Sequence, residues 1–459
     1  MSSLSSSLGI AVRSLLAEQG ALETTSNNIA NVNTPGYAKQ RPDLVEAPTV
    51  QLGSLVFGTG VQLQQITSLR DSILELRLHQ ETQQQGKLDA FIGSSQQIQS
   101  LLNEAAGNGL QAPLTAFFNS LSQLATNPSD MNLRQGVLTA AKNLAGAFNQ
   151  TATNLVTLQS NVDRSVVQSV NGINDLTAKI AQVNAQVSAA VGSGQNAGAF
   201  IDQRDLLIRQ LSAQVDVSVI DAGKGSITLT TSSGAPLVVG NQSFTLTTAT
   251  DATTGFQHVF SQGQDITAKI TRGALAGQLQ TRDTEIPSVL TGLDTLAAGL
   301  ANSVNAQHQA GFDLNGAAGG NFFVPPPAGG VGAAAALQVA LTDPAKIAAS
   351  GTGAAGDNTN INAINALQSQ AIAGGKTPMD FYAGVVFNVG NDLATAQSAQ
   401  QTQGLVLQQL QNMRGAVSGV SLDEEAANLI RFQRAFQAAG QVASVVNQLF
   451  DVAINLGKY

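Results

Sequence analysis

Residues 27–37 read NNIANVNTPGY, and this stretch sets where the first helix of the chain must stop. Pro35 disfavours α geometry at Thr34, and Pro35 with Gly36 fits the two central positions of a type II turn. Upstream of the turn, apolar residues recur at spacings that are sums of three and four, which places them on one stripe of a helix. We therefore expect an N-terminal helix that ends near Asn33. The stripe consists of Leu4, Leu8, Ala11, Leu15, Leu22 and Ile29.

The other end of the chain carries a second helix with the same apolar period. Residues 421–424, SLDE, have the Ser-x-x-Glu pattern of a capping box and predict where this helix begins. The shared period predicts that the two terminal helices pair as a coiled coil, with each other and with neighbouring copies. Periodicity alone also fits two ordinary helices that cap a single core. The C-terminal stripe consists of Leu429, Phe432, Phe436, Ala439, Ala443, Val446, Phe450 and Ala453.

Helical patterns dominate the middle of the chain. The longest begins near Leu133 and keeps a coiled-coil rhythm as far as Val187, which predicts a rod on the order of 80 to 90 Å long. Thr377 and Pro378 fit the N-cap and first position of another helix that reaches about Met413, and Gly415 and Gly419 are expected to break it. Three further helices are expected over residues 69–102, 114–124 and 275–308.

Strand patterns occupy two stretches. Residues 215–270 alternate and are punctuated by Gly, Ser, Thr and Asp, and residues 50–66 fit a hairpin. Residues 311–356 are rich in Gly, Pro and Ala and predict a loop with one strand-like run at 337–341. The fold class expected is mainly α with an inserted small β domain, paired terminal helices and a long helical rod. The predicted domains are 1–36 with 418–459 (terminal coiled coil), 37–214 with 272–417 (rod) and 215–271 (β).

The composition favours packing against other copies of the chain. Charged residues make up 11% of the 459 residues, less than half of the roughly 25% typical of soluble proteins. The polar surface must therefore be amide and hydroxyl groups, although compositional drift in an ordinary soluble protein would look the same. A net charge of -8 argues against nucleic acid as a partner. We find no signal-peptide pattern and no run of 18 apolar residues, so we expect no membrane segment.

Residues that could carry chemistry are few. The chain has no Cys, and His79, His258 and His308 show no metal-ligand spacing, so we expect no metal, no cofactor and no enzymatic activity. Residues 351–356, GTGAAG, match G-x-G-x-x-G, but no strand precedes them, which favours a surface turn over a dinucleotide site. Residues 313–316, DLNG, resemble the start of a calcium loop but lack its Gly and Glu positions and predict a turn.

The two ends of the sequence resemble one known family. Residues 27–37 resemble the signature shared by flagellar rod, hook and hook-associated proteins, and residues 422–438, LDEEAANLIRFQRAFQA, resemble the partner helix of that family. The Glu-Glu-Ala-Ala run and Phe432 before Gln433 point to the hook-filament junction branch. Phe436 stands where Tyr is commoner in the family. The middle agrees at residues 202–207, 211–212, 274–282, 286–287 and 305–320, and the β region is short.

This resemblance implies a structural subunit and not an enzyme. Proteins of that branch form a ring of copies between hook and filament, with their terminal helices as an inner tube. The partners implied are other copies of the chain, the hook protein, the second hook-filament junction protein and a flagellar export chaperone that holds the C-terminal region. The resemblance also implies type III export without a cleaved signal, hence an extracellular location at the hook-filament junction.

The candidate site residues follow from the two stripes and the turn. For contacts between subunits they are Leu8, Leu15, Leu22, Asn28, Ile29, Asn31, Thr34, Pro35, Gly36, Tyr37, Leu429, Phe432, Phe436, Val446 and Phe450. For chaperone binding they are Leu429, Phe432, Phe436, Val446, Leu449 and Phe450.

Three alternatives remain at this point. The chain could be another flagellar axial protein, either a hook or a rod component. It could be an adhesin displayed on the flagellum, with residues 215–270 as the binding segment. A muralytic or proteolytic flagellar enzyme would need a carboxylate or Cys/His site, and the sequence shows none.

Overall fold

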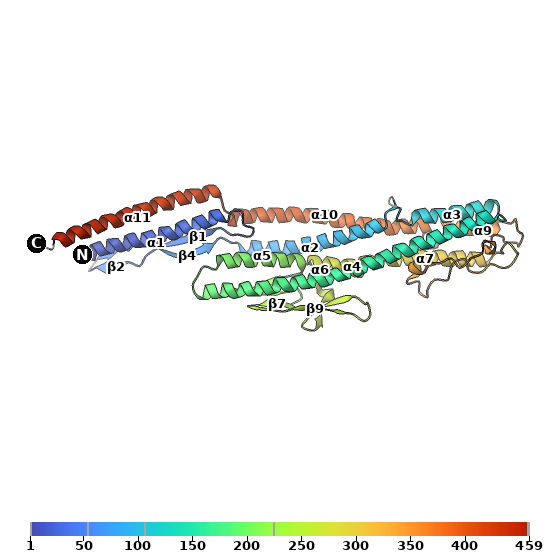
Figure 1. Cartoon of the computed structure of the whole chain (residues 1–459), viewed down its shortest axis with the longest axis horizontal. Coiled ribbons are helices and arrows are strands. Elements are labelled where there is room, and N and C mark those ends of the chain that lie inside the picture. Colours follow the sequence, from blue (N-terminus) through green and yellow to red (C-terminus); the bar gives the residue numbers. More distant parts are fainter. Residues whose placement is uncertain (1, 53–54, 105–106, 224, 457–459) are drawn as a thin grey trace.

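The chain folds into a long, narrow molecule with both termini at one end (Figure 1). The computed structural model describes residues 2–52, 55–104, 107–223 and 225–456. At the terminal end, α1 (Ser2–Ala30) and α11 (Leu422–Leu456) lie side by side, which agrees with the predicted pairing. The outermost residues of the predicted terminal domain, 1 and 457–459, lie outside the described residues.

Helix α1 ends at Ala30, three residues before the predicted Asn33. The Asn31 side chain donates to the Asn27 carbonyl at 3.0 Å and so competes with the helical backbone, a common effect of Asn. The predicted turn follows. The Tyr37 amide donates to the Thr34 carbonyl at 3.2 Å, and Gly36 has φ +87°, as a type II turn requires.

A two-stranded antiparallel sheet packs against α1. Its strands are β1 (Gln40–Glu46) and β4 (Val61–Ser68). The hairpin predicted over 50–66 is present but shorter: β2 (Val50–Leu52) pairs with β3 (Leu55–Phe57), whereas residues 61–66 belong to β4 and pair with β1. The sheet comes close to the helix at Gly20, where an added Cβ would lie 2.5 Å from the Leu63 side chain.

Long helices build the rest of the molecule. The 62 residues of α4 (Met131–Gly192) span about 93 Å at 1.5 Å per residue, which confirms the predicted rod helix. Helix α10 (Pro378–Ser418) begins as predicted, with the Thr377 hydroxyl accepting from the Asp380 amide. It continues through Gly415, which was predicted to break it. The other helices are α2 (Ser72–Leu101), α3 (Gln111–Thr126), α5 (Gly198–Gln214), α6 (Gly273–Gln280), α7 (Ile286–Gln309), α8 (Ala333–Ala336) and α9 (Thr359–Ala366).

A small β region lies on one side of the rod beside α4 (Figure 1). It contains a four-stranded and a three-stranded antiparallel sheet, and it confirms the predicted insertion of a small β region into a mainly helical chain. The strands are β5 (Ser218–Gly223), β6 (Ser226–Thr230), β7 (Pro236–Val239) and β8 (Gln242–Ser243) in one sheet, and β9 (Leu246–Thr250), β10 (Gln257–Ser261) and β11 (Gln264–Asp265) in the other.

The apolar core is confined to the rod and the β region. The larger cluster joins α3, α4 and α7 with Phe322 and Phe323 of the loop over 311–356. In that loop the predicted strand at 337–341 reduces to a single bridge between Phe323 and Val339. Among the described residues, no apolar cluster includes a residue of α1 or α11. The terminal pair therefore has a much thinner core than the rod.

Candidate assembly interface

The turn after α1 is held by the side chain of Asn28. This buried amide accepts from the Gln40 backbone amide (2.9 Å) and the Tyr37 hydroxyl (2.8 Å). It donates to the Gln40 carbonyl (2.8 Å) and to Glu425 Oε2 (3.0 Å). All four hydrogen-bonding positions of the amide are thus filled. Asn28 joins α1, the turn, β1 and α11 within one chain.

The same hydrogen bonds close the outer edge of β1. Gln40 N and O bond to Asn28, so these groups cannot pair with a strand of another chain. Pro42, two residues on, has no amide hydrogen to offer on that edge. The sheet therefore stops at two strands on this side.

Lys39 fastens the start of α11. Its Nζ lies 2.7 Å from Glu424 Oε2 and 3.2 Å from Glu425 Oε1, and its backbone amide donates to the Ser418 carbonyl at 2.8 Å. Burial opposes the charge, but the two carboxylates outweigh it and raise the pKa of Lys39. The Glu424 carboxylate binds Lys39, so the predicted capping box is only half formed. Its remaining hydrogen bond runs from the Glu424 backbone amide to the Ser421 hydroxyl and is long, at 3.5 Å.

Glu75 and two arginines link the turn to the rod. Glu75 on α2 accepts from Arg414 Nε of α10 at 2.5 Å and from Arg209 Nη2 of α5 at 3.1 Å. Arg414 also donates to the Gly36 carbonyl at 2.8 Å. Burial alone would raise the pKa of Glu75, but Arg414 and Arg209 outweigh it and lower that pKa. We call the residues Gly36, Glu75, Arg209 and Arg414 the joint.

Further polar groups lie beside the joint. Arg70 Nη2 donates to Asp202 Oδ1 at 2.5 Å, and burial raises the pKa of Asp205 to about 6. His79 is buried, finds no hydrogen-bond partner among the described residues for either ring nitrogen, and has its pKa lowered by burial to about 4. Asp202 and Asp205 belong to the stretch 202–207 singled out in the sequence. Their arginine partners indicate a structural role.

The structure turns the predicted stripe of α11 mainly toward α1. Phe432 and Val446 are buried, Leu429 and Phe450 are half-buried, and Phe436 at 37% and Leu449 at 48% are exposed. Of the predicted α1 side, Asn28 is buried and Thr34 and Pro35 are exposed. The half-buried members are Leu8, Leu15, Leu22, Ile29, Asn31, Gly36 and Tyr37. Their assignment to subunit and chaperone contacts stays a prediction.

Helix α11 carries a second apolar stripe, of which the predicted set contains only Leu449. Val442, Val445, Leu449 and Val452 recur at spacings of three, four and three, and each is 48–56% exposed. On α1, Val12 and Leu16 are exposed as well. The spacing of these four residues can be read from the sequence, but the stripe that contains Phe432, Phe436 and Phe450 was assigned instead. Each terminal helix therefore offers an open apolar face besides the one that pairs within the chain.

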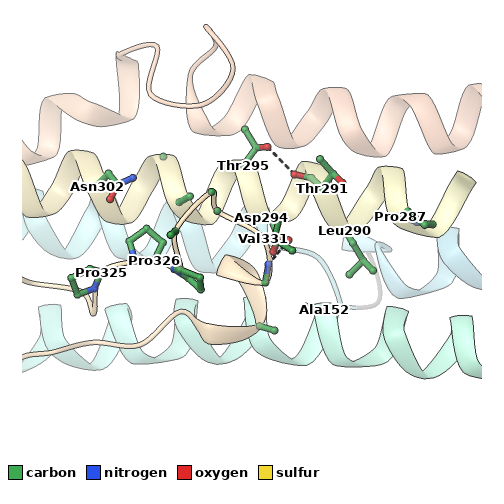
Figure 2. Close-up of a pocket in the computed structure, with 18 of the residues that line it drawn as sticks. Ala152, Pro287, Leu290, Thr291, Asp294, Thr295, Asn302, Pro325, Pro326 and Val331 are labelled. Atoms are coloured by element: carbon green, nitrogen blue, oxygen red, sulfur yellow. Dashed lines mark hydrogen bonds between the residues drawn. The ribbon is translucent and has the colours of Figure 1, made fainter. Parts of the chain in front are cut away.

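Features that resemble ligand sites have internal explanations. A cavity of about 960 Å³ lies between α4, α7 and residues 325–332 (Figure 2). The carboxylate of Asp294 at its wall accepts from the amides of Gly332 and Ala334, both at 2.8 Å. In the 351–356 segment, the backbone amides of Gly351 and Thr352 donate to the Asp357 carboxylate at 2.8 Å. The backbone amides that could bind an anion in this segment are therefore already bonded to the carboxylate of Asp357.

The described residues contain no group of three or more His, Cys, Asp or Glu placed to hold a metal ion. No helix among them has both the length and the apolar character needed to cross a membrane.

Comparison with known proteins gives matches along the whole chain. Family models match residues 95–323 (flagellar hook-associated protein FlgK helical domain), 8–37 (flagella basal body rod protein) and 413–456 (flagellar basal body rod FlgEFG protein C-terminal). The chain is 30% identical to flagellar hook-associated protein 1 of Bacillus subtilis, with 99% of each chain covered. It is 29% identical to that of Escherichia coli, with 99% of this chain and 100% of the relative covered.

A solved structure has the same fold. The flagellar hook junction protein FlgK from Burkholderia pseudomallei superimposes with a TM-score of 0.67 at 18% identity. The match covers 74% of this chain and 100% of the solved chain.

Proposed function

The chain belongs to the family of flagellar hook-associated protein 1, and on that premise we propose that copies of it form a ring that joins the hook to the filament. It is a structural subunit of the bacterial flagellum at this junction. The observation that carries the assignment is the end-to-end match to a relative at 30% identity. A structural family also supports the inference that the chain has no catalytic activity and no cofactor.

The terminal helices form the inner tube in this proposal. Their exposed apolar faces, with Val12 and Leu16 on α1 and the stripe Val442, Val445, Leu449 and Val452 on α11, suit contacts with adjacent copies. We propose that the buried and half-buried residues of the predicted stripes hold α1 and α11 together, while Thr34 and Pro35 at the turn are exposed. We further propose that the terminal helices, the helical rod and the β region are three separate domains.

The subunit assembles with the hook and with other flagellar components. More specifically, we propose the hook protein on one side of the ring and the second hook-filament junction protein on the other. Nucleic acid and membrane are not among the proposed partners, in keeping with the net charge of -8.

Before assembly, we propose export through the flagellar type III apparatus, with a chaperone on the C-terminal segment. An apolar face that includes Phe432, Phe436 and Val446 would be an aggregation hazard if left bare in the cytoplasm. A chaperone groove that accepts one face of an amphipathic helix would cover it. The same face later packs on α1, so the two partners are mutually exclusive.

The function is tested by removing the gene and imaging the cells by negative-stain electron microscopy. We expect hooks that end without filaments, and filaments restored by a plasmid copy. Normal filaments in the deletion strain would contradict the proposal. Intact hooks in the deletion strain also separate the junction role from a hook or rod role, because loss of a hook or rod subunit would remove the hook itself.

A further inference from the structure

One side of helix α10 is exposed to solvent in the described part of the chain. Between residues 393 and 413 it carries no ionisable side chain. One side packs through Leu407 and Leu410 onto Leu74 and Leu78 of α2. The free side carries an exposed stripe with the spacing of four, three, four and three that helices use to pack together. We call it the α10 stripe, and it consists of Thr402, Val406, Gln409, Met413 and Ala416.

Helix α2 has a shorter exposed stripe of the same kind. Ile73, Leu76 and Gln80 are three and four residues apart, and Ile73 is 67% exposed. Because Leu74 and Leu78 face α10 of the same chain, this α2 stripe points away from it. Ile73 and Leu76 also line a cavity of about 480 Å³ between α2, α5 and the β region.

The two stripes lie at the same position along the long axis of the molecule. Arg414 on α10 contacts Glu75 on α2, and Gln403 Nε2 donates to the Glu81 carbonyl at 3.1 Å. The helices therefore run antiparallel, with Met413 level with Ile73 and Leu76. One turn further along, Gln409 is level with Gln80.

We propose that the α10 stripe of one copy packs antiparallel on the α2 stripe of the neighbouring copy around the ring. This inference rests on the proposed ring and names one of its contacts. The two surfaces are different patches on one molecule, and such a head-to-tail contact closes into a ring when the rotation allows. Because the two stripes lie at the same position along the long axis, a rotation about an axis parallel to the rod brings them together without moving one copy along that axis.

The chemistry of the stripes favours this pairing. Burying a charged side chain at an interface carries a large desolvation cost, and the α10 stripe has none to bury. Met413 and Val406 would exchange water for Ile73 and Leu76, two of the apolar side chains that line this cavity. In each copy α2 would then lie between its own α10 and that of its neighbour.

Cysteine cross-linking tests the contact directly, because the chain has no native Cys. Flagella are isolated from cells whose only copy carries both Leu76→Cys and Met413→Cys, then oxidised and run on a non-reducing gel. We expect covalent dimers and higher species, whereas each single variant gives none. A bond within one chain would leave the mass unchanged.

Two further double-cysteine variants serve as controls. Val331→Cys with Phe387→Cys places exposed cysteines elsewhere on the rod and should give no dimer. Leu16→Cys with Val445→Cys reports contacts of the terminal helices in the ring. Dimers from this last pair but none from Leu76→Cys with Met413→Cys would overturn the inference and keep the ring. No dimers from either pair, in flagella with normal filaments, would overturn both.

Filament formation itself gives a second measure. Met413→Glu puts a charge into the proposed contact and should reduce the number of filaments per cell at least tenfold. Val156→Glu, at an equally exposed site on α4, is the matched control and should leave filaments unchanged. Equal filament numbers for the two variants would also overturn the inference.

Discussion

Single residues fix how the terminal helices leave the rod. Asn28 satisfies the outward-facing N and O of Gln40, and it also reaches Glu425 on α11. Gly36 gives the turn its positive φ and offers its carbonyl to Arg414. We expect a change at either position to alter the direction of α1 and to leave the core of the rod intact, because that core contains neither residue.

Gly36→Val should block assembly without unfolding the rod. An added Cβ would meet the Leu206 Cβ at 3.5 Å, which is ordinary contact, so space is not the problem. The problem is φ +87°, which costs a β-branched residue on the order of 1 to 3 kcal/mol. We expect an unchanged melting temperature for the rod and few or no filaments, measured by calorimetry and by a swimming assay.

Gly146→Val is the matched control for this substitution. Gly146 lies on the exposed side of α4 with open space around its Cβ position and no positive φ. It should leave swimming unchanged. Normal swimming of the Gly36→Val variant would show that the turn tolerates another geometry.

At the scale of elements, periodicity was predictive where the packing is regular. The long α4 was correctly predicted because its apolar residues recur without interruption. Strand β1 was missed because Gln40, Arg41 and Asp43 read as polar loop, and the strand owes its existence to β4 and Asn28. Gly415 was expected to end α10, but one Gly costs a helix only about 1 kcal/mol, and contacts of Arg414 beside it hold the helix in place.

The site was predictable to a similar extent. Sequence patterns gave the turn and the inner stripes, because these depend on local geometry and period. The joint was not predicted, since Glu75, Arg209 and Arg414 are far apart in sequence and only the fold brings them together. His79 was dismissed as a metal ligand, and its burial beside the joint had no sequence signal.

Helix α11 should serve two partners in succession, and Phe436 should contribute to both contacts. Phe436 is partly exposed at the border of the face that α1 covers. Truncating an aromatic anchor typically costs about 2 kcal/mol, which is roughly thirtyfold in affinity. We expect Phe436→Ala to weaken chaperone binding by that factor in calorimetric titration and to impair swimming.

The control for this test is Phe387→Ala, at an exposed aromatic on α10 outside the C-terminal segment. It should leave chaperone affinity unchanged. If Phe436→Ala keeps both full affinity and normal swimming, Phe436 is not part of a surface shared by the chaperone and the ring.

At the scale of the whole molecule, stability is unevenly distributed along the long axis. The rod buries large side chains such as Phe117 and Phe148 in a continuous core. Many of the residues that α1 buries are small or polar, such as Ala17, Ala21 and Thr25, and they remove little apolar area from water. The open faces of both terminal helices add nothing until a neighbour covers them.

The isolated subunit should therefore keep its rod folded while its two terminal segments exchange freely. A helix without tertiary support is marginal in water, and the polar run from Thr24 to Asn28 lowers its propensity further. Hydrogen-deuterium exchange on the purified monomer should show fast exchange before Tyr37 and after Ser421, with α4 strongly protected. The same peptides from assembled flagella should be protected, because neighbouring copies supply the missing contacts. Strong protection of both terminal segments in the monomer would mean that the α1 and α11 pair is stable alone, and ring formation would then need another source of free energy.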